Sequence, residues 1–270
     1  MFAQINHVAI VSAQWSLLGC FYEAAFGMKA ASKRRPASGL TIGDGYVGIN
    51  INPRRDGYVA ALDHFGMLVD DVDAVLERLR ARYPRCEVAK RPSSRPFAAY
   101  STHDPDGNVF DLAQKKNDAR GEIYGDQAAK SWSQDRYVNK FAIRTVNADK
   151  VAEFYRDVFE LEPLNRTTEA PGHHLTDGRV TLSIMPWSIG LFDGANIKRP
   201  GADHFGFKVE SIAAFRRDLD ELAGYNYNLA PSPLGGSKEA DARLALLKRC
   251  SLGQLQIADP DGNWLDISED

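Results

Sequence analysis

The sequence predicts an α+β fold built from four βαβββ modules, which form two tandem domains with curved mixed sheets. Two observations predict it. The second half of the chain repeats the first, since INHVAIVS at 5–12 recurs as VNKFAIRT at 138–145, and HDPDGNVFDLAQ at 103–114 recurs as ADPDGNWLDISE at 258–269. Within each half, a short strand, an amphipathic helix and further strands joined by tight turns occur twice.

The order of these landmarks divides the chain into three parts. We expect an N-terminal domain at residues 1–114 and a C-terminal domain at residues 137–270. Residues 115–136 between them are polar and follow neither hydrophobic period, so they are predicted to be a linker. In the first module a helix is expected from about residue 14 to residue 26.

Composition limits the classes of partner. The 270 residues are 44% hydrophobic and carry a net charge of −3, which provides no basic surface for nucleic acid. The N-terminus lacks the pattern of a signal peptide, and no apolar run is long enough to cross a membrane. We therefore expect a cytoplasmic protein that binds a small-molecule substrate and could form a homodimer. Its three cysteines include no CxxC pair, which argues against a zinc–thiolate site.

Strand parity singles out three polar side chains. Because side chains alternate across a strand, His7 is expected to share a face with Ile5 and Ala9. By the same reasoning, His64 and Asp111 share their faces with small residues, while bulky residues occupy the opposite faces. Small residues suit the open side of a curved sheet, so the three polar side chains are predicted to line one cup.

The pairing of HVAI and HFG strands with a closing strand after DPDGN resembles the vicinal oxygen chelate superfamily, which includes glyoxalase I, extradiol dioxygenases and bleomycin resistance proteins. The resemblance covers both predicted domains and implies a divalent-metal site at His7, His64 and Asp111. In some relatives the first module pairs with the fourth, and the corresponding set would be His7, His204 and Asp266. We prefer pairing of adjacent modules because the first half alone supplies a full set. The family usually has Glu where this chain has Asp111.

The second half departs further from the family pattern. Lys140 takes the place of His7, whereas His204 and Asp266 are retained. A cationic amine cannot ligate a metal, and Lys140 could pair with Asp266 where the ion would lie. The second domain is therefore expected to be a degenerate copy kept for folding and assembly, with an anion or regulatory site as the alternative.

Tyr100 is the candidate catalytic residue. Ring-cleaving relatives place a tyrosine just before the DPDG turn, and the resemblance implies a hydrogen bond from its phenol to a substrate oxygen. In this chain the spacing is longer by one residue, so Tyr100 would face the cup only if a β-bulge intervened. Packing on the opposite face is the alternative.

The resemblance implies a metal-dependent enzyme, and we expect an extradiol-like ring-cleaving dioxygenase with Fe(II) as its cofactor and Mn(II) or Zn(II) as alternatives. Two imidazoles and one carboxylate leave coordination positions open for substrate. A lyase or isomerase of the glyoxalase or epimerase kind is the first alternative, although the segment YVGININ offers only Asn50 or Asn52 in place of a second carboxylate. A metal-free binding protein is the second alternative, favoured by Asp111 and Lys140.

Overall fold

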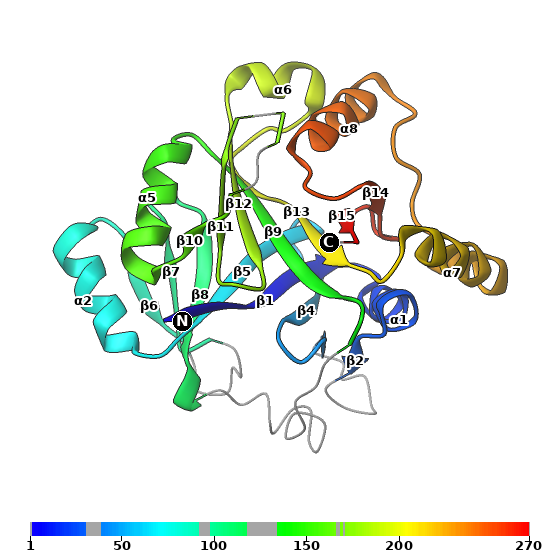
Figure 1. Cartoon of the computed structure of the whole chain (residues 1–270). Coiled ribbons are helices and arrows are strands. Elements are labelled where there is room, and N and C mark those ends of the chain that lie inside the picture. Colours follow the sequence, from blue (N-terminus) through cyan, green and yellow to red (C-terminus); the bar gives the residue numbers. More distant parts are fainter. Residues whose placement is uncertain are drawn as a thin grey trace.

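The computed structural model describes residues 2–30, 39–91, 98–117, 134–165, 168–169 and 171–269. These residues form two mixed sheets, one from each half of the chain, with helices packed around them (Figure 1). The predicted α+β class with two tandem domains is confirmed. Most of the predicted linker lies outside the described residues, apart from a short 3-10 turn, η1 (Lys115–Asn117), and the residues that lead into the second half.

The first sheet has eight strands in the order β2-β3-β4-β1-β5-β8-β7-β6. Its strands are β1 (Ala3–Ser12), β2 (Lys29–Ala30), β3 (Leu40–Gly43), β4 (Gly48–Pro53), β5 (Ala61–Val69), β6 (Val88–Lys90), β7 (Tyr100–His103) and β8 (Val109–Gln114). The two helices of this half are α1 (Trp15–Phe26) and α2 (Val72–Arg82). β1 and β5, the first strands of the first two modules, pair antiparallel at the centre, so adjacent modules share one sheet.

The second sheet has seven strands in the order β10-β11-β12-β9-β13-β15-β14. Its strands are β9 (Tyr137–Thr145), β10 (Glu162–Pro163), β11 (His173–Thr176), β12 (Thr181–Pro186), β13 (Gly201–Lys208), β14 (Leu255–Ala258) and β15 (Trp264–Ser268). Its helices are α5 (Ala148–Phe159), α6 (Ile189–Ala195), α7 (Ile212–Tyr225), the 3-10 turn η2 (Tyr227–Leu229) and α8 (Lys238–Cys250).

The fourth module departs from the βαβββ pattern. Among the described residues, only β14 and β15 follow α7 as strands, and a single antiparallel bridge between Ser232 and Ala258 stands where a further strand would pair. Helix α8 is inserted between that bridge and β14. The second sheet is therefore one strand narrower than the first.

Local sequence accounts for the helix ends. Helix α1 starts after Gln14 and ends at Gly27, whose φ of 67° lies in the left-handed region that glycine adopts at little cost. The start of α2 is capped by Asp71, whose carboxylate accepts from the amides of Asp73 and Ala74. Asn147 caps α5 in the same way. The predicted first helix, at about residues 14–26, is confirmed.

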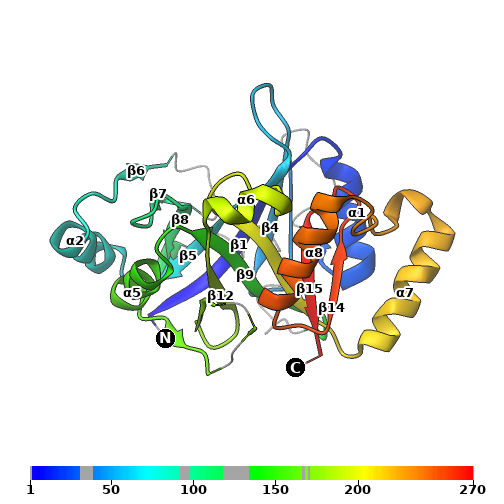
Figure 2. The ribbon, with the colours of Figure 1, turned by 90° about the horizontal axis from the view of Figure 1, so that it is seen from above.

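One hydrophobic core spans both halves of the chain. Helix α1 lies beside α7 of the fourth module, and α2 lies beside α5 of the third (Figures 1 and 2). Across the first contact, the ring of Phe26 stacks on that of Phe207 with centroids 3.8 Å apart. Between the sheets, the ring centroids of Phe65 and Phe141 are 4.9 Å apart. The two domains thus bury their helix-covered faces against each other.

Hydrogen bonds cross this contact in reciprocal pairs. Asp44, in the turn between β3 and β4, accepts from the Val138 amide at 2.8 Å. Asp177, in the matching turn between β11 and β12, accepts from the Ile5 amide at 2.7 Å. All four residues are fully or almost fully buried. Each hairpin turn therefore completes the hydrogen bonding of the first strand of the other domain.

A second reciprocal pair links the helices to the DPDGN turns. The phenol of Tyr22 on α1 donates to Asp259 of the fourth module at 2.6 Å. The phenol of Tyr155 on α5 donates to Asp104 of the second module at 3.3 Å. Both tyrosines are fully buried, so these hydrogen bonds satisfy groups that water cannot reach.

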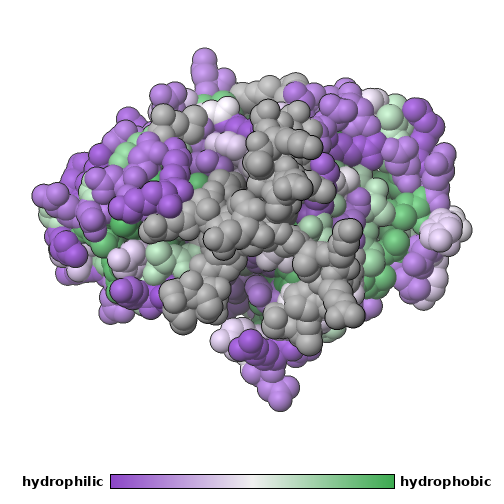
Figure 3. All heavy atoms as spheres, turned by 90° about the horizontal axis from the view of Figure 1, so that it is seen from below, coloured by the Kyte–Doolittle hydropathy of each residue, from purple (hydrophilic) through white to green (hydrophobic). Residues whose placement is uncertain are grey.

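No helix in the described part of the chain is long and apolar enough to cross a bilayer. In Figure 3 the described residues on the visible face are mostly hydrophilic, with smaller hydrophobic areas between them.

Candidate metal centre

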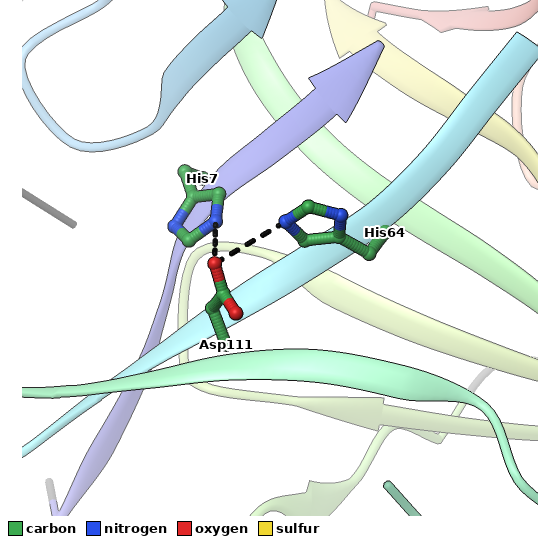
Figure 4. A group of neighbouring side chains, drawn as sticks. All are labelled: His7, His64 and Asp111. Atoms are coloured by element: carbon green, nitrogen blue, oxygen red, sulfur yellow. Dashed lines mark ion pairs between the residues drawn. The ribbon is translucent and has the colours of Figure 1, made fainter. Parts of the chain in front are cut away.

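Three neighbouring strands bring His7, His64 and Asp111 together on one face of the first sheet (Figure 4). His7 on β1 and Asp111 on β8 lie on either side of Gly66 in the register, and His64 precedes Gly66 by two residues on β5. Oδ2 of Asp111 lies 3.3 Å from Nε2 of His64 and 3.8 Å from Nε2 of His7. His7 is fully buried and Asp111 is 3% exposed.

Two β-bulges orient the imidazoles. The register of β1 against β5 shifts between Ile5 and His7 and again opposite Asp63, so that Asn6 and Asp63 are extra residues. Each extra residue directly precedes a histidine and contacts its Nδ1. Oδ1 of Asn6 lies 3.0 Å from Nδ1 of His7, and Oδ2 of Asp63 lies 2.7 Å from Nδ1 of His64. Such a contact fixes the ring and leaves Nε2 to face the carboxylate. The bulge at Asn6 also places Ile5 in the hydrophobic core, whereas strict alternation predicted Ile5 on the His7 face.

Gly66 makes room for the first imidazole. A Cβ atom at this position would lie 2.0 Å from Cε1 of His7 and 2.8 Å from its Nε2, far inside van der Waals contact. The ring of His7 lies over Gly66 on β5, the strand between His7 and Asp111. The HFG motif therefore needs glycine at this position, because any side chain would collide with the ring.

Ser101 and Arg91 complete the surroundings of the carboxylate. The hydroxyl of Ser101, on the neighbouring strand β7, donates to Oδ1 of Asp111. Arg91 Nε donates to the Ser101 hydroxyl at 2.6 Å and lies 3.9 Å from Oδ1 of Asp111. Ser101 and Arg91 thus lie on the Oδ1 side of the carboxylate, and Oδ2 faces the two histidines.

Electrostatics couple His64 to Asp111. Burial lowers the pKa of His64, but hydrogen bonds and charge from Asp111 and Asp63 outweigh it and raise the pKa to about 9. Burial raises the pKa of Asp111, but His64, His7 and Ser101 outweigh it and lower the pKa to about 2. Without a metal the pair therefore holds its proton on His64 at neutral pH.

The three side chains fit a divalent metal ion. Their candidate donor atoms lie within 4.8 Å of one another, and within the described ranges they form the one group of this kind. Donors about 2.1 Å from an ion and at right angles to one another lie about 3 Å apart, so the separations of 3.3 and 3.8 Å from Asp111 to the two histidines are near this value, and all three separations are within 4.8 Å. Two imidazole nitrogens and one carboxylate oxygen suit iron, manganese or zinc.

Tyr100 lies on the other side of the sheet. It pairs with Leu112 in a register between β7 and β8 that shows no bulge, so the neighbouring Ser101 takes the position opposite Asp111. The ring of Tyr100 packs against the hydrophobic core and lines a surface pocket with Leu76 and Leu79 of α2. Without a bulge the odd spacing turns the Tyr100 side chain away from the cup, which is the packing placement that the sequence left as its alternative.

The second domain repeats the register of the site with different chemistry. Lys140 and Asp266 lie on either side of Gly206, and His204 lies opposite Ala142 as His64 lies opposite Ala9. Nζ of Lys140 is 2.8 Å from Oδ2 of Asp266, and the side chains are 3% and 1% exposed. The ammonium group therefore occupies the place where the first domain brings an imidazole to its carboxylate, as the sequence predicted.

The alternative ligand set is not assembled. His7 belongs to the first sheet, whereas His204 and Asp266 belong to the second. His204 is instead held within its own domain, with Nδ1 2.8 Å from Oδ2 of Asp203. Helix α8 also closes this second cup, since Cys250 at its end packs on Ala142 and Met185.

A groove between the two domains borders the candidate centre. It encloses about 940 Å³ and includes Asp63 and His64 on one side and residues 196–203 on the other, with both DPDGN turns in its wall. His64 is also the most accessible of the three candidate ligands, with 15% of its side chain exposed. The groove thus reaches the site at His64, and its lining includes neither His7 nor Asp111.

Comparison with known proteins agrees with this architecture. The model of the "Glyoxalase/Bleomycin resistance protein/Dioxygenase superfamily" matches residues 4–112 and 137–267. Among solved structures, the chain is similar to the Mn(II)-bound glyoxalase from Novosphingobium aromaticivorans, with 15% identity and a TM-score of 0.65 over 99% of this chain and 82% of that chain. It is similar to a variant of homoprotocatechuate 2,3-dioxygenase from B. fuscum, with 13% identity and a TM-score of 0.63 over 98% and 70% of the two chains.

The 2,3-dioxygenase LapB from Pseudomonas sp. KL28 also matches, with 13% identity and a TM-score of 0.62 over 98% of this chain and 91% of that chain. Identities this low show a shared fold. No curated protein sequence matches the chain.

Proposed function

Because the chain belongs to the Glyoxalase/Bleomycin resistance protein/Dioxygenase superfamily, we propose that it is a metal-dependent enzyme of the extradiol-like, ring-cleaving dioxygenase type. In this proposal His7, His64 and Asp111 hold a divalent metal, with Fe(II) favoured over Mn(II) or Zn(II), and the substrate is a small molecule with vicinal oxygen atoms. The convergence of the three donor groups on one face of one sheet supports it.

The observation that carries the choice of reaction is the number of carboxylates. On β4, the residue opposite Ala9 is Asn50, whose side-chain oxygen accepts from Thr41, and β4 contains no carboxylate. A glyoxalase-like lyase needs a further base or ligand at this level, whereas three protein ligands leave coordination positions open for a substrate that chelates through two oxygens. The donor set therefore favours the dioxygenase over the lyase or isomerase.

The residues of this chain would have distinct tasks in such a reaction. A divalent metal at this position supplies Lewis acidity and, as iron, redox chemistry with oxygen. Asp63 and Asn6 keep the two Nε2 atoms directed at the site, and Ser101 fixes the carboxylate. The burial of His7 and Asp111 keeps bulk water from the reacting groups.

One observation favours a second candidate, a metal-free binding protein. His64 and Asp111 already form a hydrogen-bonded ion pair at 3.3 Å with a raised and a lowered pKa, so the site is electrostatically satisfied without an ion. In that case the site would bind a planar ligand without transforming it.

Metal analysis decides between the two. Protein purified without affinity tag or chelator is analysed by mass spectrometry, together with His7→Ala and, as a matched control, His204→Ala, which removes the buried histidine of the second domain. The enzyme proposal expects nearly one iron or manganese per chain in wild type and in His204→Ala, and little in His7→Ala.

Oxygen uptake with a panel of catechols then separates the dioxygenase from the lyase. Uptake that depends on the metal and on His7 supports the dioxygenase, whereas retained metal without uptake on any catechol favours the lyase or isomerase. A chain that takes up no iron, manganese or zinc from solution refutes both enzymes and leaves the binding protein.

A further inference from the structure

Arg91 extends into the cup from the edge of the first sheet. It directly follows β6, where its amide donates to the Ala99 carbonyl at 2.8 Å. The preceding Lys90 pairs with Tyr100 on the helix-covered face, so alternation directs Arg91 to the cup face with Ser101. The hydrogen bond from Nε to Ser101 at 2.6 Å shows that the side chain follows this direction.

Within the described residues, only the Nε edge of this guanidinium makes hydrogen bonds. Nε contacts Ser101 and approaches Asp111, and among the described residues none accepts a hydrogen bond from the two terminal amino groups. The side chain is 36% exposed. By contrast, the buried Arg144 of the second domain donates Nε to Asp203 and also contacts the Pro186 carbonyl. Arg91 therefore presents two terminal amino groups that have no acceptor in the described part of the chain, beside the candidate metal centre.

The charges near the site favour an anion at these amino groups. A divalent ion with Asp111 as its carboxylate ligand and two neutral imidazoles leaves one net positive charge, which Asp63 beside His64 offsets, so the charge of Arg91 leaves the site with one net positive charge. A guanidinium binds a carboxylate through two parallel hydrogen bonds, an arrangement that a partly desolvated site strengthens. Arg91 Nε lies 3.9 Å from Oδ1 of Asp111, and Oδ2 of the same carboxylate faces the two histidines, so a substrate that contacted both groups would span this carboxylate.

We propose that Arg91 binds a carboxylate of the substrate, so that the substrate class is an anionic compound that carries a carboxylate in addition to its vicinal oxygens. This inference rests on the proposed function. Ser101 links the two binding groups, since it donates to Asp111 and accepts from Arg91. Chelation at the ion and recognition of the carboxylate are thereby held in one fixed geometry.

Binding to a redox-inert form of the protein tests the proposal without turnover. The Zn(II)-loaded protein is titrated calorimetrically with catechol and with two carboxylated catechols, protocatechuate and pyrocatechuate. Wild type is expected to bind at least one carboxylated catechol about tenfold or more tightly than catechol. Arg91→Gln is expected to bring this ratio close to one.

Two further variants serve as controls for the effect of Arg91→Gln. Arg80→Gln, a change of the same kind on α2, is expected to retain the wild-type ratio. Arg91→Lys keeps the charge but not the two terminal amino groups, and its ratio is expected to fall between those of wild type and Arg91→Gln. Circular dichroism and bound zinc establish that each variant is folded and loaded.

The outcomes separate this inference from the proposed function. A protein that retains zinc but shows no preference for a carboxylated catechol, or the same preference in Arg91→Gln, overturns the role of Arg91 alone. A chain that retains no zinc, or that binds the catechols equally well with and without it, overturns both proposals.

Discussion

Replacing Lys140 by methionine should destabilise the protein strongly, although no ligand is expected to touch this residue. Methionine keeps the length of the side chain but removes the ammonium group, which leaves the carboxylate of Asp266 buried without its counter-charge. Breaking a buried ion pair by removing one partner typically costs about 3–5 kcal/mol. Asp266 keeps hydrogen bonds from the amides of Leu252 and Gly253 and from Gln256, so we expect the lower end, about 3 kcal/mol.

Urea denaturation followed by circular dichroism measures this loss. A chain of this length has an unfolding entropy of about 0.57 kcal/mol/K, so a loss of about 3 kcal/mol lowers the melting temperature by about 5 °C. Lys208→Met is the control, since Lys208 lies on the same sheet, is half-buried and makes no ion pair within the described residues; it should change stability by less than about 0.5 kcal/mol. Adding Asp266→Asn to Lys140→Met should recover part of the loss, with a coupling energy of about 2 kcal/mol.

The dependence of stability on pH tests the same ion pair. Burial raises the pKa of Asp266, but the charges of Lys140 and His204 outweigh it and hold that pKa well below its usual range. The stability that this carboxylate contributes is therefore present above its unfolded pKa of about 3.9 and is lost as the pH falls below that value. In Lys140→Met this acid-dependent loss should shrink. If Lys140→Met is as stable as wild type, or if the effects of Lys140→Met and Asp266→Asn on stability simply add, the predicted ion-pair contribution is refuted.

Two further predictions concern the candidate metal centre. Gly66→Ala should abolish metal binding, because its Cβ would displace the ring of His7; mass spectrometry of the folded variant checks this, and a full complement of metal would contradict it. Metal binding should also release nearly one proton per chain near pH 7.5, because the metal-free His64 has a pKa of about 9 and must lose its proton to become a ligand. The release should fall toward zero as the pH rises above 9. Calorimetry in buffers of different ionisation enthalpy measures it, and no release at pH 7.5 would exclude His64 as a ligand.

The fold was predictable because repetition reveals it. Two halves that share their landmarks in the same order require the same architecture twice, and alternation along regular strands is enough to place His64 and Asp111 on one face. Insertions and lost strands within one copy of a repeat are harder to predict from sequence. The fourth module reduces one strand to a bridge at Ser232 and adds α8, and neither change leaves a pattern that differs from an ordinary loop and helix in the sequence.

The parts of the site that the sequence did not predict depend on single-residue irregularities. A bulge adds one residue without changing composition, so strict alternation predicts Ile5 on the His7 face, whereas the extra residue Asn6 turns Ile5 into the core. For Tyr100 the spacing requires a bulge if the side chain is to face the cup, and the register of β7 with β8 shows none. The polar residue directly before each histidine was the available signal, because a side chain that can hold Nδ1 precedes both His7 and His64.

Arg91 could not have been recognised by the same means. It lies 20 positions before Asp111, directly after the edge strand β6, and the pairing of β6 with β7 and of β7 with β8 brings the two together. Such proximity depends on strand order, which spacing along the chain does not encode.

The exchange of carboxylates between hairpin turns has a consequence for how the protein folds. Asp44 and Asp177 each satisfy an amide of the opposite domain, so a first domain produced alone would expose Ile5 and leave Asp44 with an empty hydrogen-bonding position next to uncovered aromatic rings. Neither half is then an independent folding unit, and thermal unfolding should follow a single transition. We therefore expect the second domain, which has Lys140 where the first has His7, to act as an internal support that the first domain needs in order to fold.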